Sequence, residues 1–194
     1  MFSSPLVLQI PSSMQMTDEQ FFEFCQVNRD LRIERNKFGE LLIMPPTDSE
    51  TGNRAGNISG QLWVWSEQDG TGITFSSSTG FKLSTGAERS PDASWIKLER
   101  WNTLSPEQQR KFAPICPDFL VELKSPSDNL QTLKEKMEEY MNEPGIQLGW
   151  LIDRKQRQVY IYRPGFSEEC LDNLANVSGE LVLPGFILNM SKVW

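Results

Sequence analysis

The sequence predicts a mixed α/β fold, in which a central β-sheet is flanked by helices. Apolar residues run almost without interruption through 117–124 and again through 147–153, which is typical of strands buried on both faces of a sheet. Between these runs, residues 129–143 have the spacing of an amphipathic helix. The order strand, helix, strand over this length predicts a βαβ unit with two parallel strands.

The elements upstream have their own local signals. Thr17 and Gln20 have the spacing of a capping box, which predicts the start of a helix that ends near residue 28. The segments 31–34 and 40–44 predict the two strands of a hairpin, which a Pro-Pro pair then ends.

Further elements follow in the order of the chain. Residues 50–68 have helix-like spacing, and short β segments are expected at 73–77, 81–83 and 92–97. Residues 159–162 return as a hairpin strand after the second apolar run. These antiparallel additions make the expected sheet a mixed one.

The chain has 194 residues, which is room for one domain of about 100–200 residues. We expect a single domain over 1–194. Its core lies at about 50–165, with the N-terminal helix and hairpin at 15–46 as a decoration and 166–194 as a C-terminal extension.

The composition excludes several kinds of chemistry. The chain contains no histidine, so Ser-His-Asp and Cys-His catalysis and histidine-bound zinc are all excluded. The 3 cysteines are far apart, without the pattern of a disulfide scaffold, and fit buried thiols in a reducing cytoplasm. No stretch approaches the ~20 apolar residues of a membrane span. A net charge of −7 argues against a generally basic nucleic-acid surface.

Two ionisable side chains lie at the C-terminal end of the first expected buried strand, where apolar residues are usual. Glu122 and Lys124 are two residues apart, so they point to the same face at a spacing of about 6–7 Å. A carboxylate that can hold a divalent cation would thus lie beside an ammonium that can act on water or phosphate. A structural ion pair at a strand end is the alternative.

A second carboxylate, Asp92, follows a proline at the start of the expected strand 92–97. On a strand next to Glu122 it would complete an oxygen-only site suited to Mg²⁺, although an Asp after Pro is also common in turns. Asp118 lies about 13 Å from Glu122 along the strand, too far to share one ion. Asp153 is expected on a polar hairpin turn, in solvent.

Several segments together resemble a known family. These are the Pro-Asp at 91–92, the run PDFLVELKSPSD from residue 117, a helix with Lys136 and Tyr140, GWLID, and the hairpin sequence VYIYRPG. The combination resembles the Uma-type restriction endonuclease family of the PD-(D/E)XK nuclease superfamily, in the version common in cyanobacteria. The similarity extends from GELLIMPP at 39–46 to the C-terminal tryptophan.

The resemblance implies a restriction-endonuclease-like core and a metal-dependent endonuclease that hydrolyses DNA phosphodiester bonds with Mg²⁺ or Mn²⁺. Asp92, Glu122 and the backbone carbonyl of Leu123 would then be the metal ligands, and Lys124 the catalytic lysine. Many relatives carry their lysine on the following helix instead, where this chain has Lys136. Lys136 is therefore a second catalytic candidate, or a side chain whose stem packs while its ammonium reaches solvent.

The family's Gly-Glu-Leu motif adds Glu40 to the catalytic candidates, with an exposed hairpin carboxylate as the alternative. DNA would be the partner, and the superfamily's use of two copies for double-strand cleavage implies a homodimer. Trp63, Trp65, Trp101 and Trp194 are candidates for an interface or for the core. The basic residues expected to bind substrate are Arg54, Lys82, Arg89, Lys97 and Lys134.

Two other functions stay open. One is a non-catalytic interaction module on a nuclease scaffold, because a fold does not guarantee its function. The other is a metal-dependent hydrolase of a smaller phosphate substrate. The sequence has no P-loop and no G-x-G-x-x-G motif, so no nucleotide cofactor is expected.

Overall fold

The computed structural model describes residues 5–194. The described chain divides into two compact units. The second and larger unit carries the candidate site and comprises Thr47–Ser77, Pro91–Thr103 and Cys116–Trp194. The first unit comprises the residues up to Pro46, Ser78–Ser90 and Leu104–Ile115.

The larger unit is built on a six-stranded sheet with the order β11-β10-β9-β8-β7-β4. Among these described strands, β8 and β9 form the parallel pair, and the other neighbours are antiparallel. The mixed sheet that the sequence predicts is thus confirmed. The strands are β4 (Gly72–Ser76), β7 (Ala93–Lys97), β8 (Phe119–Lys124), β9 (Leu148–Asp153), β10 (Gln158–Tyr162) and β11 (Glu169–Asp172).

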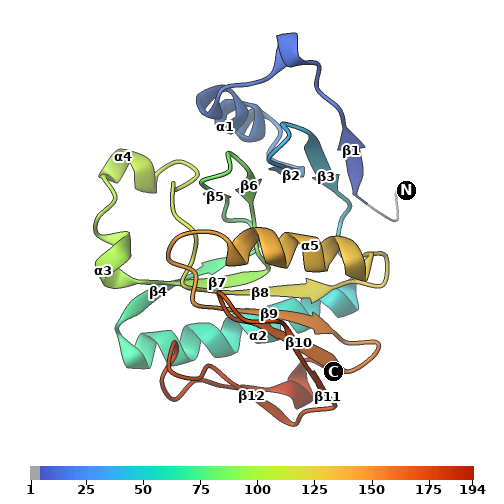
Figure 1. The fold of residues 1–194 in the computed structure, drawn as a ribbon, viewed down its shortest axis with the longest axis vertical. Coiled ribbons are helices and arrows are strands. Elements are labelled where there is room, and N and C mark those ends of the chain that lie inside the picture. The colour runs from blue at the N-terminus through green and yellow to red at the C-terminus, as the bar shows by residue number, and fades with distance from the viewer. Residues whose placement is uncertain (1–4) are drawn as a thin grey trace. The chain divides into compact units, whose positions relative to one another are not determined.

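Two long helices belong to this unit. Helix α5 (Leu130–Met141) connects β8 to β9, and helix α2 (Ser49–Asp69) precedes β4. Figure 1 shows α5 along one side of the sheet and α2 along the other. Asn129 caps α5 by accepting the backbone N–H groups of the first turn, which fixes where the helix begins. The predicted βαβ unit is present.

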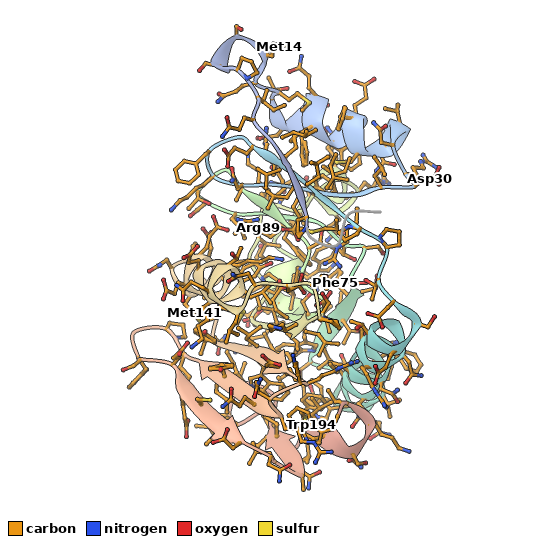
Figure 2. The ribbon with its side chains drawn as sticks, turned by 90° about the vertical axis from the view of Figure 1, so that its right-hand side faces the viewer. Met14, Asp30, Phe75, Arg89, Met141 and Trp194 are labelled. Atoms are coloured by element: carbon orange, nitrogen blue, oxygen red, sulfur yellow. The ribbon has the colours of Figure 1, made fainter. Side chains whose placement is uncertain are left out.

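The core on the α2 side is rich in aromatic residues. Phe119, Trp150 and Phe186 are in mutual ring contact, and Ile58 and Leu62 of α2 pack into the same cluster. Every second residue of β8, beginning with Phe119, belongs to this cluster, so the residues between them face α5. Trp194, labelled in Figure 2, packs against the cluster from the C-terminus.

On the α5 side the helix lies close to the sheet. Gly149 of β9 faces α5, and a Cβ atom there would lie 2.6 Å from the terminal methyl of Met137 and 2.7 Å from that of Met141. The absence of a side chain at this position lets the helix approach the sheet.

The C-terminal segment is part of the larger unit. It supplies β11 to the sheet, and its buried Val177 and Leu188 belong to the α2-side cluster. Its remaining elements are β12 (Asn176–Ser178), β13 (Ile187–Asn189) and a 3₁₀ turn, Met190–Lys192. The short helix α3 (Leu98–Trp101) follows β7 in the same unit.

The smaller unit has a five-stranded sheet with the order β1-β3-β2-β6-β5. Strands β2 and β3 form the predicted hairpin, and Thr17 and Gln20 form the predicted capping box of α1. The short β6 was not predicted, because two residues carry too little periodicity. The elements are β1 (Leu6–Leu8), α1 (Asp18–Val27), β2 (Arg32–Arg35), β3 (Leu41–Met44), β5 (Phe81–Lys82), β6 (Glu88–Arg89), α4 (Pro106–Gln109) and a 3₁₀ turn, Ser12–Met14.

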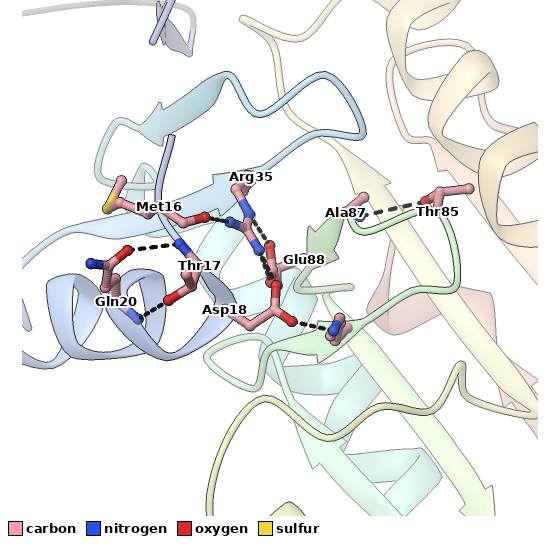
Figure 3. Close-up of polar contacts among 9 residues, drawn as sticks. Met16, Thr17, Asp18, Gln20, Arg35, Thr85, Ala87 and Glu88 are labelled. Carbon is pink, nitrogen blue, oxygen red and sulfur yellow. Dashed lines mark hydrogen bonds and ion pairs between the residues drawn. The ribbon is translucent and has the colours of Figure 1, made fainter. Parts of the chain in front are cut away.

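An ion-pair network around the buried Arg35 and Glu88 links the elements of this smaller unit (Figure 3). The guanidinium of Arg35 binds both carboxylate oxygens of Glu88, at 2.5 and 2.6 Å, and also binds Asp18 at 2.6 Å. Lys82 pairs with the other oxygen of Asp18. Burial raises the pKa of Glu88, and the hydrogen bonds from Arg35 oppose that rise.

The expected lack of a membrane-spanning helix can be compared with the structure. No helix within residues 5–194 is long and apolar enough to span a membrane.

The three cysteines differ in their exposure to solvent. Cys116 is buried as expected, Cys25 is only partly buried, and Cys170 on β11 is exposed, so the expectation of three buried thiols is met in full only at Cys116. Cys170 lies on the edge strand β11, where Glu169 and Asp172 are exposed as well.

Candidate active site

Asp92 lies immediately before β7, beside the end of β8. Its backbone N–H donates to the carbonyl of Val121 at 3.0 Å, and its Oδ2 accepts the backbone N–H of Leu123 at 2.8 Å. The pairing of β7 with β8 ends at Ala93 and Val121, so Leu123 has no strand residue of β7 opposite it. The carboxylate of Asp92 replaces that missing partner and is thereby fixed next to Glu122.

Glu122 is buried in the middle of the sheet, with 3% of its surface exposed. Its Oε1 lies 2.8 Å from Nζ of Lys136 and accepts a hydrogen bond from the hydroxyl of Tyr140 at 3.1 Å. Both partners come from α5, one turn apart on the same helix face. The ammonium stays at the sheet, so Lys136 does not extend into solvent.

Lys124 lies on the α5 side of β8, as Glu122 does, so the predicted common face of these two residues is present. In the parallel pairing its neighbour on β9 is Asp153. The Nζ of Lys124 is 3.9 Å from Oδ2 of Asp153 and 3.4 Å from the carbonyl of Ser125.

The expectation that Asp153 is a solvated turn residue is wrong. It is the last residue of β9, only 4% exposed, and its Oδ1 accepts the backbone N–H groups of Lys155 and Gln156 at 3.0 and 3.2 Å. The polar turn begins one residue later, and the parallel register places Asp153 beside Lys124. The hydrophobic periodicity and the polarity of the residues around Asp153 could not by themselves distinguish the end of a strand from a turn.

The donors at this site suit a hard divalent cation. Asp92, Glu122 and the carbonyl of Leu123 are all oxygen donors, and Mg²⁺ commonly takes one or two protein carboxylates and completes its shell with water and phosphate oxygens. Within residues 5–194 no group of three or more His, Cys, Asp or Glu side chains is arranged to hold a metal ion. The set fits a two-carboxylate site and does not fit a fully protein-ligated one.

Asp118, excluded from the site by distance, has a structural role. It is fully buried at the start of β8, where it accepts hydrogen bonds from Arg100 at 2.7 Å and from Gln147 at 2.8 Å. Its Oδ2 also accepts the backbone N–H of Lys97 at 3.0 Å. Lys97 therefore lies at the far end of β7, about 16 Å along the strand from Asp92.

The other basic candidates of the larger unit have partners. Lys134 pairs with Glu168, and its Nζ lies 4.2 Å from the ring centre of Tyr160. Arg54 is on α2, with Glu50 at 4.0 Å. The role of these basic side chains toward a substrate stays a prediction.

Three candidates belong to the smaller unit, where they have local partners. Glu40 accepts a hydrogen bond from the side chain of Asn36 at 2.7 Å. Arg89 is buried and pairs with Glu34 at 3.1 Å, and Lys82 pairs with Asp18 as described above. Their roles toward a substrate stay predictions.

Comparisons with known proteins agree with this architecture. The family described as "Uma2: Putative restriction endonuclease" matches residues 18–191. A crystal structure titled as a putative nuclease belonging to DUF820 from Anabaena variabilis ATCC 29413 superimposes with a TM-score of 0.71. That similarity covers 92% of this chain and 97% of the other at 18% sequence identity, so it shows the fold alone. No curated protein matches the chain. Because the family match includes nearly all of the described residues, the chain belongs to the Uma2 family.

Proposed function

We propose that this protein is a Mg²⁺- or Mn²⁺-dependent endonuclease that hydrolyses phosphodiester bonds in DNA. The observation that carries the proposal is the pair of carboxylates, Asp92 and Glu122, fixed beside each other at the end of β8 with Lys124 and Lys136 nearby. Membership of the Uma2 family supports the nuclease class. The oxygen-only donors support the choice of metal.

Asp92, Glu122 and the carbonyl of Leu123 would hold the ion. When bound, a divalent ion supplies a water of lowered pKa and neutralises charge on the phosphate. The side chains of the protein would hold the ligand carboxylates in position. Asp92 is held by the Leu123 N–H, and Glu122 by Lys136 and Tyr140, so neither carboxylate has to reorganise during the reaction.

Lys124 completes the proposed chemistry. Its ammonium is on the same face of β8 as Glu122, where it would orient the attacking water and stabilise negative charge that develops on the phosphate. Lys136 would offset the charge of Glu122, because its Nζ lies 2.8 Å from that carboxylate. The two lysines thus have different partners and different proposed roles.

DNA binding has to overcome the net charge of −7. The contact residues proposed from the sequence are largely engaged with acidic side chains, so phosphate would have to replace those partners. We therefore expect weak, strongly salt-dependent binding, measured as fluorescence anisotropy of a labelled duplex over a salt series. Binding that does not change with salt would contradict the proposal.

The test of the function is the nicking of supercoiled plasmid at low salt with Mg²⁺, Mn²⁺ or EDTA. Asp92→Asn should lower the rate by about 10²–10³-fold, because the amide keeps an oxygen for the Leu123 N–H but lacks the charge that a cation needs. Asp128→Asn is the matched control, since Asp128 also accepts one backbone N–H, that of Ser125, at 2.8 Å. It should nick like the wild type.

Other outcomes select the alternatives. If folded protein nicks under no condition and Mn²⁺ does not raise its melting temperature, it is a non-catalytic interaction module. Metal-dependent turnover of nucleotides without any plasmid cleavage would point to a small phosphate substrate.

The proposal includes a second copy of the chain, as cleavage of both strands by this superfamily implies. Of the four tryptophans considered for an interface, Trp63 on α2 is exposed, whereas Trp65 packs on Trp95 and Trp101 on Phe75. Light scattering should give twice the monomer mass of 22.2 kDa. Only the monomer mass, at concentrations that support nicking, would contradict a stable dimer.

A further inference from the structure

We infer that Asp153 is a positioning residue for the active-site lysine Lys124. The inference rests on the proposed nuclease function and deepens it, because it assigns different tasks to the two lysines of the site. Asp153 would act on the reaction through Lys124.

The carboxylate of Asp153 divides its two oxygens between two tasks. Oδ1 accepts the N–H groups of Lys155 and Gln156, whereas Oδ2 faces the ammonium of Lys124 at 3.9 Å. One oxygen is thus fixed by backbone and the other is directed at the lysine. A carboxylate held in this way presents its charge at a defined point.

The turn that holds Oδ1 is itself well defined. It closes with a hydrogen bond from the N–H of Arg157 to the carbonyl of Arg154 at 3.2 Å, and Arg157 adopts a left-handed conformation with φ 53°. Strand β9 fixes Asp153 from the other side through its parallel pairing with β8. The position of the charge is therefore set by two backbone elements.

The position of the Lys124 ammonium has to be fixed by neighbouring groups, since lysine carries a compact charge on a flexible four-carbon stem. Its side chain is 13% exposed and has the Ser125 carbonyl at 3.4 Å and the Asp153 carboxylate at 3.9 Å as nearby acceptors. Both contacts are longer than the 2.8 Å between Lys136 and Glu122. Lys124 is oriented without being bound tightly, which suits a group that must reach a substrate, whereas Lys136 is closely paired.

The variant Asp153→Asn separates the two tasks of the side chain. The amide oxygen still accepts the two turn N–H groups, but the charge that faces Lys124 is lost. We expect kcat for plasmid nicking to fall about 10–100-fold with KM unchanged, as for other residues that orient a catalytic group. In Lys124→Met, kcat should fall further, and kcat of the double variant should be no lower than that of Lys124→Met alone.

Asp118→Asn is the matched control for general loss of stability. Asp118 is equally buried and also pairs with a basic residue, Arg100, but lies at the opposite end of β8 from Lys124, about 20 Å away. It should lower the melting temperature with kcat unchanged. Wild-type kcat in Asp153→Asn, or rate losses that multiply in the double variant, would overturn the inference.

A second measurement keeps the inference separate from the proposed function. If the wild type does not nick DNA, the function fails, and a double-mutant cycle in metal-free protein still tests the pair. We expect the changes in melting temperature for Asp153→Asn and Lys124→Met not to add in the double variant. Additive changes would show that the two side chains do not interact, and the positioning role would be refuted.

Discussion

Replacing Glu122 by alanine is expected to abolish metal-dependent cleavage and to lower the free energy of unfolding by about 3–5 kcal/mol. Cleavage is lost because one of the two proposed ligand carboxylates is gone. Stability is lost because the ammonium of Lys136, with 11% of its side chain exposed, loses the carboxylate that lies 2.8 Å from it. Tyr140, fully buried, also loses its hydrogen bond to Glu122.

Plasmid nicking and urea unfolding of the same samples measure the two effects. The control is the double variant Glu122→Leu, Lys136→Met, which replaces the ion pair by apolar side chains of similar size. It should recover much of the stability, since such replacements of buried pairs are often neutral, yet remain inactive. A Glu122→Ala protein that still nicks DNA would exclude Glu122 as a ligand.

Replacing Arg35 by alanine should destabilise the protein by a similar amount, about 3–5 kcal/mol at pH 8. Arg35 is a buried cation of the smaller unit, and without it Glu88, 2% exposed, would lose the guanidinium that binds both of its carboxylate oxygens. Burial already raises the pKa of Glu88 above the usual value. Without Arg35 the rise is larger, so the loss of stability grows as the pH rises through that pKa and shrinks toward acid, where the carboxyl is protonated in both states.

Urea unfolding at pH 8 and pH 5 measures this effect. Lys111→Ala is the control, because Lys111 pairs with Glu19 and Glu107 at the surface, where ion pairs contribute little. It should unfold like the wild type at both pH values. Equal destabilisation of Arg35→Ala at the two pH values would show that the unpaired carboxylate is not its cause.

The sequence was sufficient for the features that depend on local pattern. The two mainly apolar runs with a helix between them predicted β8, α5 and β9 with parallel pairing. The period of two placed Glu122 and Lys124 on one face. We predicted that Asp92 and Glu122 lie near each other because their strands were expected to be adjacent. The antiparallel pairing of β7 with β8 confirms that the strands are adjacent.

Other features depend on contacts between distant segments. The burial of Asp153 arises from the register of β9 against β8, which no local pattern encodes. Lys82 and Arg89 were chosen for their charge, but their acidic partners, Asp18 and Glu34, lie more than fifty residues away in the sequence. Tyr140 was visible only as part of a motif, and its hydrogen bond to Glu122 required the packing of α5.

Asp92 has two roles. Its side chain accepts a hydrogen bond from the backbone N–H of Leu123, and its negative charge is proposed to bind the metal ion. An asparagine at this position would meet the first and fail the second. A gene that has lost its nuclease activity can therefore keep a well-folded product through this single exchange. Among relatives, asparagine at position 92 would mark copies retained for some purpose other than cleavage.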